Sequence, residues 1–224
     1  MSKHLQHEID ALKRSILSIG TMVEDALKRS VDALLERNEI TAKKVIENDT
    51  EIDMKEVELE EDCLKILALH QPVAIDLRFI VALIKINSDL ERIGDLAVNI
   101  AERTLFITGK PPIKVDFDFR DMANKTLDMV KDSLDSLVNM DVPLARTVCS
   151  ADDEVDDMNR QMFTTALESI EKDPDNKEAY LRYMLVARHL ERISDHATNI
   201  AENVIYLEEG EIVRHRMKYL NPKK

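Results

Sequence analysis

The chain has 224 residues, of which 33% are charged, and its net charge is −13. An acidic protein repels phosphate groups, so nucleic acid is not expected as a main partner. No apolar N-terminal leader and no run of about 18 apolar residues occurs, which predicts a cytoplasmic protein without a membrane span. The chain contains only 4 glycines and 6 prolines, a composition that favours long, uninterrupted helices.

Breaks in this composition predict six helices in chain order, each about 25 to 36 residues long. Short turns are expected at residues 38–39 and 140–143, and Pro72 is expected to start the third helix because proline fits a first turn. The segment 108–116, with a glycine and two prolines, is the strongest break. The sixth helix follows the break at residues 171–176 and ends at Gly210. Short connections make neighbouring helices antiparallel.

The second half of the chain repeats the first. "LERIGDLAVNIAE" at 90–102 returns as "LERISDHATNIAE" at 190–202, with ten of thirteen positions identical. Likewise "AKKVIENDTEID" at 42–53 aligns with "ARTVCSADDEVD" at 145–156, and "MVEDAL" at 22–27 with "MVKDSL" at 129–134. This predicts an all-α fold of two tandem three-helix bundles made by internal duplication, with the first helix about one turn longer than the fourth. The predicted units are residues 1–110, residues 115–208 and a basic tail at 209–224.

The third and sixth helices carry an apolar seam of the coiled-coil type. Apolar residues recur at alternating spacings of three and four, as expected for a buried stripe. The seam residues are Phe79, Leu83, Ile86, Leu90, Ile93, Ala97, Ile100 and Ile107, and in the second copy Leu190, Ile193, Ala197, Ile200 and Val204. A second stripe, nearly opposite, begins with apolar residues such as Leu77, Val81 and Leu181, and we expect a neighbour to cover part of it.

Farther along this second stripe the residues become acidic. Glu91 and Asp95 lie four positions apart, and the second helix carries a similar pair, Asp49 and Asp53. Like charges at this spacing repel one another, but they place two carboxylates about 5–6 Å apart on one helix face. That arrangement suits a multivalent cation with oxygen ligands. The pairs Asp152/Asp156 and Glu191/Asp195 repeat it. The alternative is that these faces are merely solvated.

Motifs for catalysis are not found in the sequence. No phosphate-binding glycine loop, nucleophile elbow or zinc-protease motif occurs, and the Glu-x-x-His spacing of di-iron bundles is missing. We therefore expect a protein that is not an enzyme. A carboxylate-bridged metal enzyme and a structural helical bundle remain as alternatives.

Two segments together resemble a known family. These are "QPVAIDLRFIVALIKINSDLERIGDLAVNIAE" at 71–102 and "LVARHLERISDHATNIAENVIY" at 185–206. They closely resemble PhoU, the family of phosphate-uptake regulators, and the resemblance extends from Met22 to Tyr206. It implies a negative regulator of phosphate uptake and of the phosphate-starvation response, acting as an adaptor between the phosphate ABC transporter ATPase and a sensor histidine kinase. It also implies a homodimer that reaches the membrane only through its partners.

The resemblance also assigns metal ligands. Family members bind metal through their E/DxxxD motifs, with multinuclear iron in some of them, while Mg²⁺, Mn²⁺ and Ca²⁺ stay open here. The implied ligands are Asp49, Asp53, Glu91, Asp95, Asn99, Glu102, Asp152, Asp156, Glu191, Asp195, Asn199 and Glu202. The two copies differ at Gly94 against Ser194 and at Leu96 against His196, so the two sites are not expected to be identical.

Overall fold

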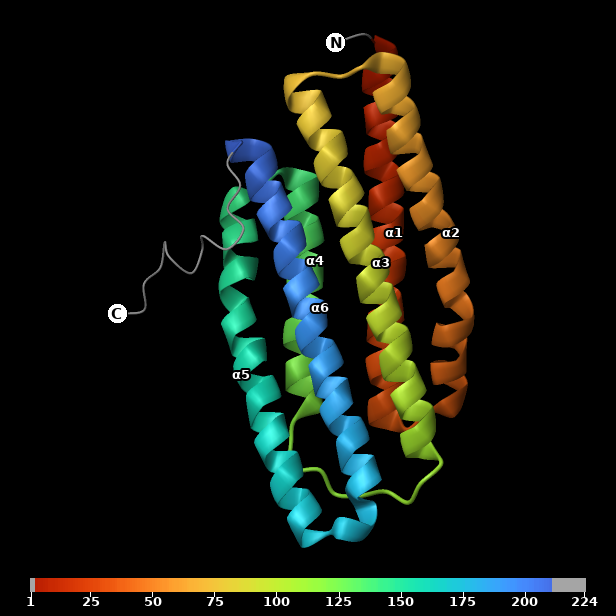
Figure 1. Cartoon of the computed structure of the whole chain (residues 1–224), viewed down its shortest axis with the longest axis vertical. Helices are drawn as coiled ribbons and strands as arrows, with labels where there is room; N and C mark the ends of the chain where they lie inside the picture. Colours follow the sequence, from red (N-terminus) through yellow and green to blue (C-terminus); the bar gives the residue numbers. More distant parts are fainter. Residues whose placement is uncertain (1–2, 211–224) are drawn as a thin grey trace, which may run out of the picture.

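The computed structural model describes residues 3–210, which form six α-helices and one short 3₁₀ turn (Figure 1). This confirms the predicted all-α fold. The elements are α1 (Lys3–Glu36), α2 (Glu39–His70), α3 (Ala74–Thr108), α4 (Phe119–Asn139), α5 (Val142–Lys172), η1 (Pro174–Asn176) and α6 (Lys177–Glu209).

Polar side chains at the predicted breaks fix where three of the helices begin. The Oδ1 atom of Asn38 accepts a hydrogen bond from the backbone N–H of Thr41 at 3.0 Å, and Asp141 accepts one from Leu144 at the same distance. Asp118 does the same for α4. Such N-caps satisfy backbone donors that have no partner inside the helix. At the other end of the chain, α6 ends at Gly210, whose φ of 74° suits a residue without a side chain.

The helices form two three-helix bundles that pack against each other. The first bundle consists of α1, α2 and α3, and the second of α4, α5 and α6. Helices α3 and α6 lie side by side at the centre of Figure 1 with α2 and α5 outside them, while α1 and α4 form a second layer behind. The bundles therefore meet through two helix pairs, α3 with α6 and α1 with α4.

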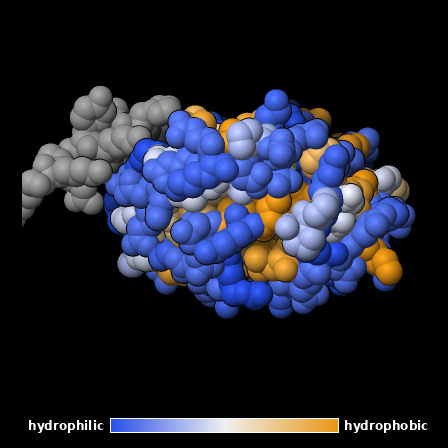
Figure 2. All heavy atoms as spheres, turned by 90° about the horizontal axis from the view of Figure 1, so that it is seen from below, coloured by the Kyte–Doolittle hydropathy of each residue, from blue (hydrophilic) through white to orange (hydrophobic). Residues whose placement is uncertain are grey.

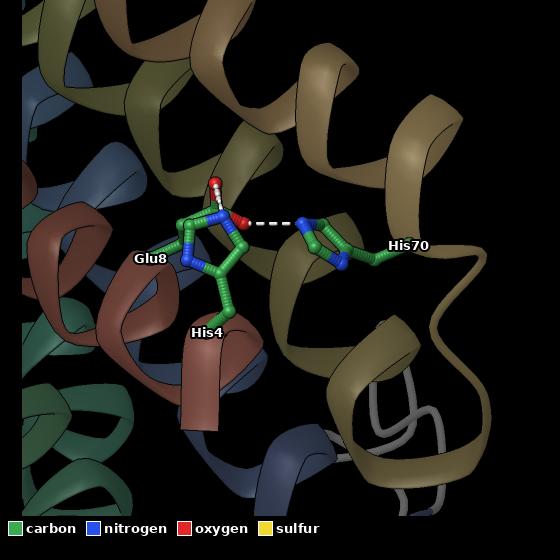
Figure 3. A group of neighbouring side chains, drawn as sticks. All are labelled: His4, Glu8 and His70. Carbon is green, nitrogen blue, oxygen red and sulfur yellow. Dashed lines mark ion pairs between the residues drawn. The ribbon is translucent and has the colours of Figure 1, made fainter. Parts of the chain in front are cut away.

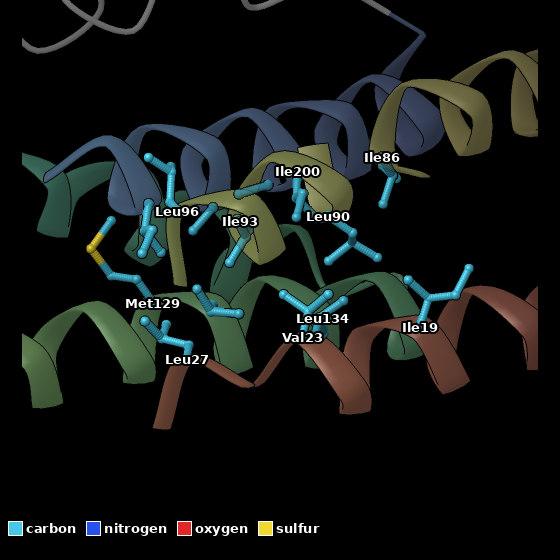
Figure 4. Close-up of a cluster of buried hydrophobic side chains, with 14 of the residues drawn as sticks. Ile19, Val23, Leu27, Ile86, Leu90, Ile93, Leu96, Met129, Leu134 and Ile200 are labelled. Atoms are coloured by element: carbon cyan, nitrogen blue, oxygen red, sulfur yellow. The ribbon is translucent and has the colours of Figure 1, made fainter. Parts of the chain in front are cut away.

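One hydrophobic core extends through both bundles. Figure 4 shows Val23 of α1, Leu90 of α3, Leu134 of α4 and Ile200 of α6 converging in it. All the predicted seam residues of α3 and α6 are buried, so the seam prediction is confirmed. Gly20 permits close approach of α1 and α4, because an added Cβ atom would lie 2.9 Å from the side chain of Leu134.

Two predictions about the helices are wrong. Helix α4 has only 21 residues, which is below the expected range of lengths. Helix α1 has 34 residues, so it is longer than α4 by far more than the one turn that was expected. The apolar start of the second stripe is covered in part, as expected: Tyr180 is 5% exposed, whereas Leu77 and Leu181 are 41% and 47% exposed. A three-helix bundle buries one face of each long helix, and the described part of the chain supplies no further helix for this outer face.

No helix within residues 3–210 has both the length and the apolar composition that crossing a membrane requires. The predicted basic tail, apart from its first two residues, lies outside the described part of the chain. Seen from the end that carries the connection between the bundles, the surface is mainly hydrophilic around a small hydrophobic area (Figure 2).

Candidate metal centres

The acidic pairs of α2 and α3 meet in the folded chain. We call Asp49, Asp53, Glu91 and Asp95 cluster one. An added Cβ atom on Gly94 would lie 3.6 Å from Oδ1 of Asp49, so the α2 carboxylate reaches the backbone of α3. The carboxylates influence one another strongly across the two helices. Partial burial, and then the charges of Asp53 and Asp95, raise the pKa of Asp49 to about 6.

Arginine offsets part of the negative charge in cluster one. Burial and the nearby charge of Asp95 raise the pKa of Glu91, while Arg92 acts in the opposite direction. The Nε atom of Arg92 lies 3.3 Å from Oε2 of Glu91, and its Nη1 lies 3.2 Å from Oδ2 of Asp95. Arg92 is largely exposed, so solvent screens these ion pairs and they leave the carboxylates free to exchange partners.

The second bundle repeats the arrangement. We call Asp152, Asp156, Glu191 and Asp195 cluster two, which lies between α5 and α6. Partial burial, and then the charges of Asp195 and Asp156, raise the pKa of Asp152 to about 6. Burial and the neighbouring Asp195 likewise raise the pKa of Glu191. The same sequence spacing therefore produces the same rise in carboxyl pKa in both copies.

Two oxygens of cluster two have no hydrogen-bond partner among the described residues. They are Oδ1 of Asp152 and Oε2 of Glu191, and both atoms are buried. Glu191 as a whole is only 7% exposed. A buried carboxylate oxygen without a partner destabilises the folded state unless something compensates it. A cation bound between the two helices would supply the missing partner.

The carboxylates of each cluster lie near enough to raise one another's pKa, but among the described residues no three of them bring ligand oxygens within 4.8 Å of one another, so their side chains would have to move together to hold one hard multivalent cation. Four carboxylates from two adjacent helices offer enough oxygen atoms for such an ion, and an ion would relieve their mutual repulsion. The helix pairs place the eight predicted acidic ligands as two groups of four whose charges interact, while their role as metal ligands stays a prediction. The ion would be held by Asp49, Asp53, Glu91 and Asp95 in cluster one, and by Asp152, Asp156, Glu191 and Asp195 in cluster two.

The four other predicted ligands lie farther along the helices. Asn99 donates a hydrogen bond from Nδ2 to the backbone oxygen of Asp95 at 2.8 Å. The side chain of Asn199 instead donates to Oδ1 of Asp89 on α3, at 3.2 Å. Glu102 is exposed, and Glu202 lies close enough to Cys149 to contribute to the raised pKa of that thiol. Their role as further metal ligands therefore stays a prediction.

Sequence reasoning missed one member of the cluster-one environment. Glu56 lies one turn beyond Asp53 on α2, and its charge helps to raise the pKa of Glu91. Asn87 of α3 holds it by donating from Nδ2 to its backbone oxygen at 2.9 Å and to its Oε1 at 3.3 Å. The signal was present, because Asp49, Asp53 and Glu56 follow the spacing of one helix face. The duplication concealed it, since the equivalent residue in α5 is Asn159.

Between the clusters, α3 and α6 make a polar contact that joins the two bundles. Nδ1 of His196 lies 2.9 Å from Oδ1 of Asp89, the same oxygen that accepts the bond from Asn199. His189, which aligns with Asp89 in the second copy, is buried and neither of its ring nitrogens has a hydrogen-bond partner among the described residues. The departure of His196 from its counterpart Leu96 is thus explained by packing between the bundles.

These features define a class of protein: a duplicated α-helical bundle that carries one carboxylate cluster in each half. Comparison with known proteins gives the family. The profile of the PhoU domain matches twice, at residues 16–104 and 119–204. The chain therefore belongs to the PhoU family.

Individual relatives agree with this assignment. The chain is 40% identical to a phosphate-specific transport system accessory protein PhoU homolog of Aquifex aeolicus, over 93% of this chain and 95% of that protein. It is 36% identical to PhoU homolog 1 of Thermotoga maritima, over 96% and 93% of the two chains. Among solved structures, PhoU from Pseudomonas aeruginosa superposes with a TM-score of 0.88 at 33% identity, over 92% of this chain and 99% of that one.

Proposed function

We propose that this protein is a non-catalytic accessory regulator of phosphate transport, which represses phosphate uptake and the phosphate-starvation response when phosphate is plentiful. Family membership over both halves of the chain is the observation that carries the proposal. The relatives from Aquifex aeolicus and Thermotoga maritima are named for the phosphate-specific transport system. The partners in this proposal are the transporter ATPase and a sensor histidine kinase, in the cytoplasm, and the active form is a homodimer.

Metal binding at the two carboxylate clusters is part of this proposal. The pKa values of Asp49 and Asp152 are raised first by partial burial and then by repulsion from neighbouring carboxylates, and a multivalent cation would relieve that repulsion. Multinuclear iron is the proposed ion, and Mg²⁺, Mn²⁺ and Ca²⁺ are the alternatives that share its preference for carboxylate oxygens. The ion stabilises the arrangement of α2 against α3 and of α5 against α6.

A groove beside cluster two is the proposed contact surface for a partner. This α5–α6 groove has a volume of about 800 Å³ and an apolar floor that includes Phe163, Leu181 and Leu185. Two arginines, Arg160 and Arg188, also line it. An apolar floor with arginines beside it suits a partner helix that has an apolar face flanked by acidic side chains.

Both groove arginines pair with acids of cluster two, but only Arg188 depends on that cluster. Arg188 forms an ion pair with Glu191, whereas Arg160 lies 3.6 Å from Oδ2 of Asp156 and pairs more closely with Asp157 outside the cluster. A cation that takes Glu191 as a ligand would release Arg188 toward the groove. Metal at cluster two would therefore favour an acidic partner, and this links the metal centre to partner binding.

The function is tested by deleting the gene in its source cell. Phosphate-responsive genes are then expected to remain active in high phosphate, and transporter ATPase and sensor kinase are expected to co-purify with the tagged wild-type protein. A deletion strain that represses these genes normally in high phosphate would overturn the proposal.

The groove is tested by replacing Arg160 and Arg188 with glutamine. Capture of the partners by the metal-loaded protein should fall, while the metal content should stay as in the wild type. Arg92→Gln is the matched control, because Arg92 pairs with cluster one but does not line the groove. Equal capture by both variants would contradict the assignment of this surface.

A further inference from the structure

A second kind of metal-ligand group lies at the end of the first bundle, away from the carboxylate clusters. His4 and Glu8 are four residues apart on α1, and His70 is the last residue of α2. Figure 3 shows the three side chains directed toward one another, with the glutamate between the two imidazole rings. One possible ligand atom from each residue lies within 4.8 Å of the others.

Glu8 connects the two histidines. Its Oε1 lies 3.5 Å from Nε2 of His4, and its Oε2 lies 2.6 Å from Nε2 of His70. The second contact is an ion pair when His70 is protonated, yet Oε2 of Glu8 is buried and has no hydrogen-bond partner among the described residues. An ion placed between the three side chains would satisfy this oxygen and both ring nitrogens.

The geometry is close to that of a bound ion but not identical to it. Zinc bonds of about 2.0–2.2 Å in a tetrahedron place ligand atoms about 3.4 Å apart. The three atoms here need only a small movement to reach that spacing. His4 can make this movement, because its side chain is 73% exposed whereas those of Glu8 and His70 are 28% and 20% exposed.

We propose that His4, Glu8 and His70 form a binding site for one divalent transition-metal ion, with Zn²⁺ as the best fit. Two imidazole nitrogens and one carboxylate oxygen are a common ligand set for zinc, and water completes the coordination from the exposed side of His4. This chemistry differs from that of the carboxylate clusters, which contain only oxygen ligands. The ion would fasten the start of α1 to the end of α2.

The duplication does not provide a second copy of this site. When Met22 is aligned with Met129, the first residue of α4, Phe119, aligns with Leu12 of α1. The first two turns of α1, which carry His4 and Glu8, therefore have no counterpart. The equivalent of His70 in the second copy is Asp173, which accepts a hydrogen bond from Asn176. The site is thus expected once in each chain.

The test measures Zn²⁺ binding by the full chain after removal of all metal with a chelator. Excess Mg²⁺ is added to occupy carboxylate sites, because Mg²⁺ prefers oxygen ligands. A chromophoric chelator then reports the affinity of each variant for Zn²⁺. The variants are the wild type, His4→Ala/His70→Ala and His7→Ala. The last is a matched control, since His7 is an exposed histidine next to Glu8 that does not belong to the group.

The wild type and His7→Ala are expected to bind one Zn²⁺ ion at least about 10–100-fold more tightly than the double variant, because even the loss of an outer partner weakens a metal site by that factor. Equal affinity and stoichiometry in all three proteins would overturn the proposal. So would a loss of affinity in His7→Ala equal to that in the double variant. The result does not depend on the function proposed above, which is tested in the cell.

Discussion

The two carboxylate clusters share their spacing but differ in what surrounds them. In cluster one, Arg92 pairs with two of the acids from within α3, and Glu56 adds a further negative charge nearby. In cluster two, the acids pair with Arg160 and Arg188, both of which line the α5–α6 groove. The corresponding positions in the first copy are Val57 and Ser88, so cluster one has no arginines of this kind.

The two copies therefore share the carboxylates but differ in the surface beside them. Both copies keep the carboxylates and the helix spacing that arranges them. The second copy also combines them with an apolar groove that is flanked by arginine. A change of charge at cluster two would therefore act on Arg188 beside this groove, which we propose as the surface that contacts a partner.

The largest expected effect is the loss of bound metal from one cluster at a time. Changing the four acids of cluster one to Asn or Gln should remove its ions and leave those of cluster two, and the reciprocal variant should do the reverse. The amide side chains keep the shape but lose the charge that attracts a cation. Metal content is measured by mass spectrometry of the purified protein. A variant with all eight acids changed that retains the wild-type metal content would contradict metal binding at these sites.

The next effect concerns the acid sensitivity of His189, which aligns with Asp89 of the first copy. Burial, and then the charges of Arg103 and Arg192, lower the pKa of His189 to about 4. The folded state therefore resists protonation of this ring. The stability due to the neutral ring is fully present above pH 6.5, the value for an ordinary histidine, and is lost as the pH falls toward 4.

His189→Leu should remove this sensitivity to acid. Its gain in stability over the wild type should be greater at pH 5 than at pH 8 by about 2 kcal/mol, or about 4–8 °C in Tm for a chain of this size. Thermal unfolding at both pH values measures the difference, and His7→Ala is an exposed control. A gain that is the same at both pH values would show that His189 does not titrate as described.

A smaller effect compares Asp152 with Asp49 in protein freed of metal. Because both pKa values are raised to about 6, ionisation of these carboxyls costs stability. The cost is absent below the ordinary value of 3.8 and complete above about 6. With chelator present, Asp152→Asn should therefore raise Tm at pH 7.5 and leave it unchanged near pH 4.

Solvent screening at these partly exposed groups limits the gain to about 1 kcal/mol, or about 2–4 °C. Asp49→Asn should gain less than Asp152→Asn, because a buried oxygen of Asp152 has no hydrogen-bond partner among the described residues. Adding metal should reverse the order of stability, with both variants below the wild type. A Tm that is indifferent to these substitutions at pH 7.5 would remove the electrostatic argument for the clusters.

Much of the fold could be predicted because it depends on local signals. Asn38 and Asp141 cap helices through bonds to residues three positions away, and the seam from Phe79 to Ile107 follows helical spacing. The meeting of Asp49 with Asp95 could also be predicted, since short connections make α2 and α3 antiparallel neighbours. Local spacing together with duplication thus located both clusters.

What could not be predicted depends on contacts between distant segments. The direction of Asn199 toward Asp89 follows from how α3 packs on α6, and nothing in either helix alone specifies it. The approach of His70 to Glu8 depends on where α2 ends relative to the start of α1. The shortness of α4 was missed because the alignment with α1 starts within both helices and does not reveal where each begins.

The smallest expected effect concerns the residues beside the clusters, Gly94 and Ser194. A Cβ atom on Gly94 would make only ordinary contacts with Asp49 and Ile52, at 3.6 Å, so Gly94→Ser fits without a clash. Glycine inside a helix costs stability because it loses the most backbone freedom on folding, and serine costs less. Gly94→Ser should therefore raise the free energy of unfolding by about 0.5 kcal/mol, or about 1–2 °C in Tm, and Ser194→Gly should lower it by a similar amount. Neither change removes a carboxylate, although Ser194 donates to Asp152 and a side chain at position 94 would contact Asp49, so the metal content should stay the same in both variants. If Gly94→Ser instead lowered Tm or removed metal from cluster one, the approach of Asp49 to α3 would require a glycine at position 94. The two clusters would then differ in the residue that their helices need at close approach, as well as in the charged residues around them.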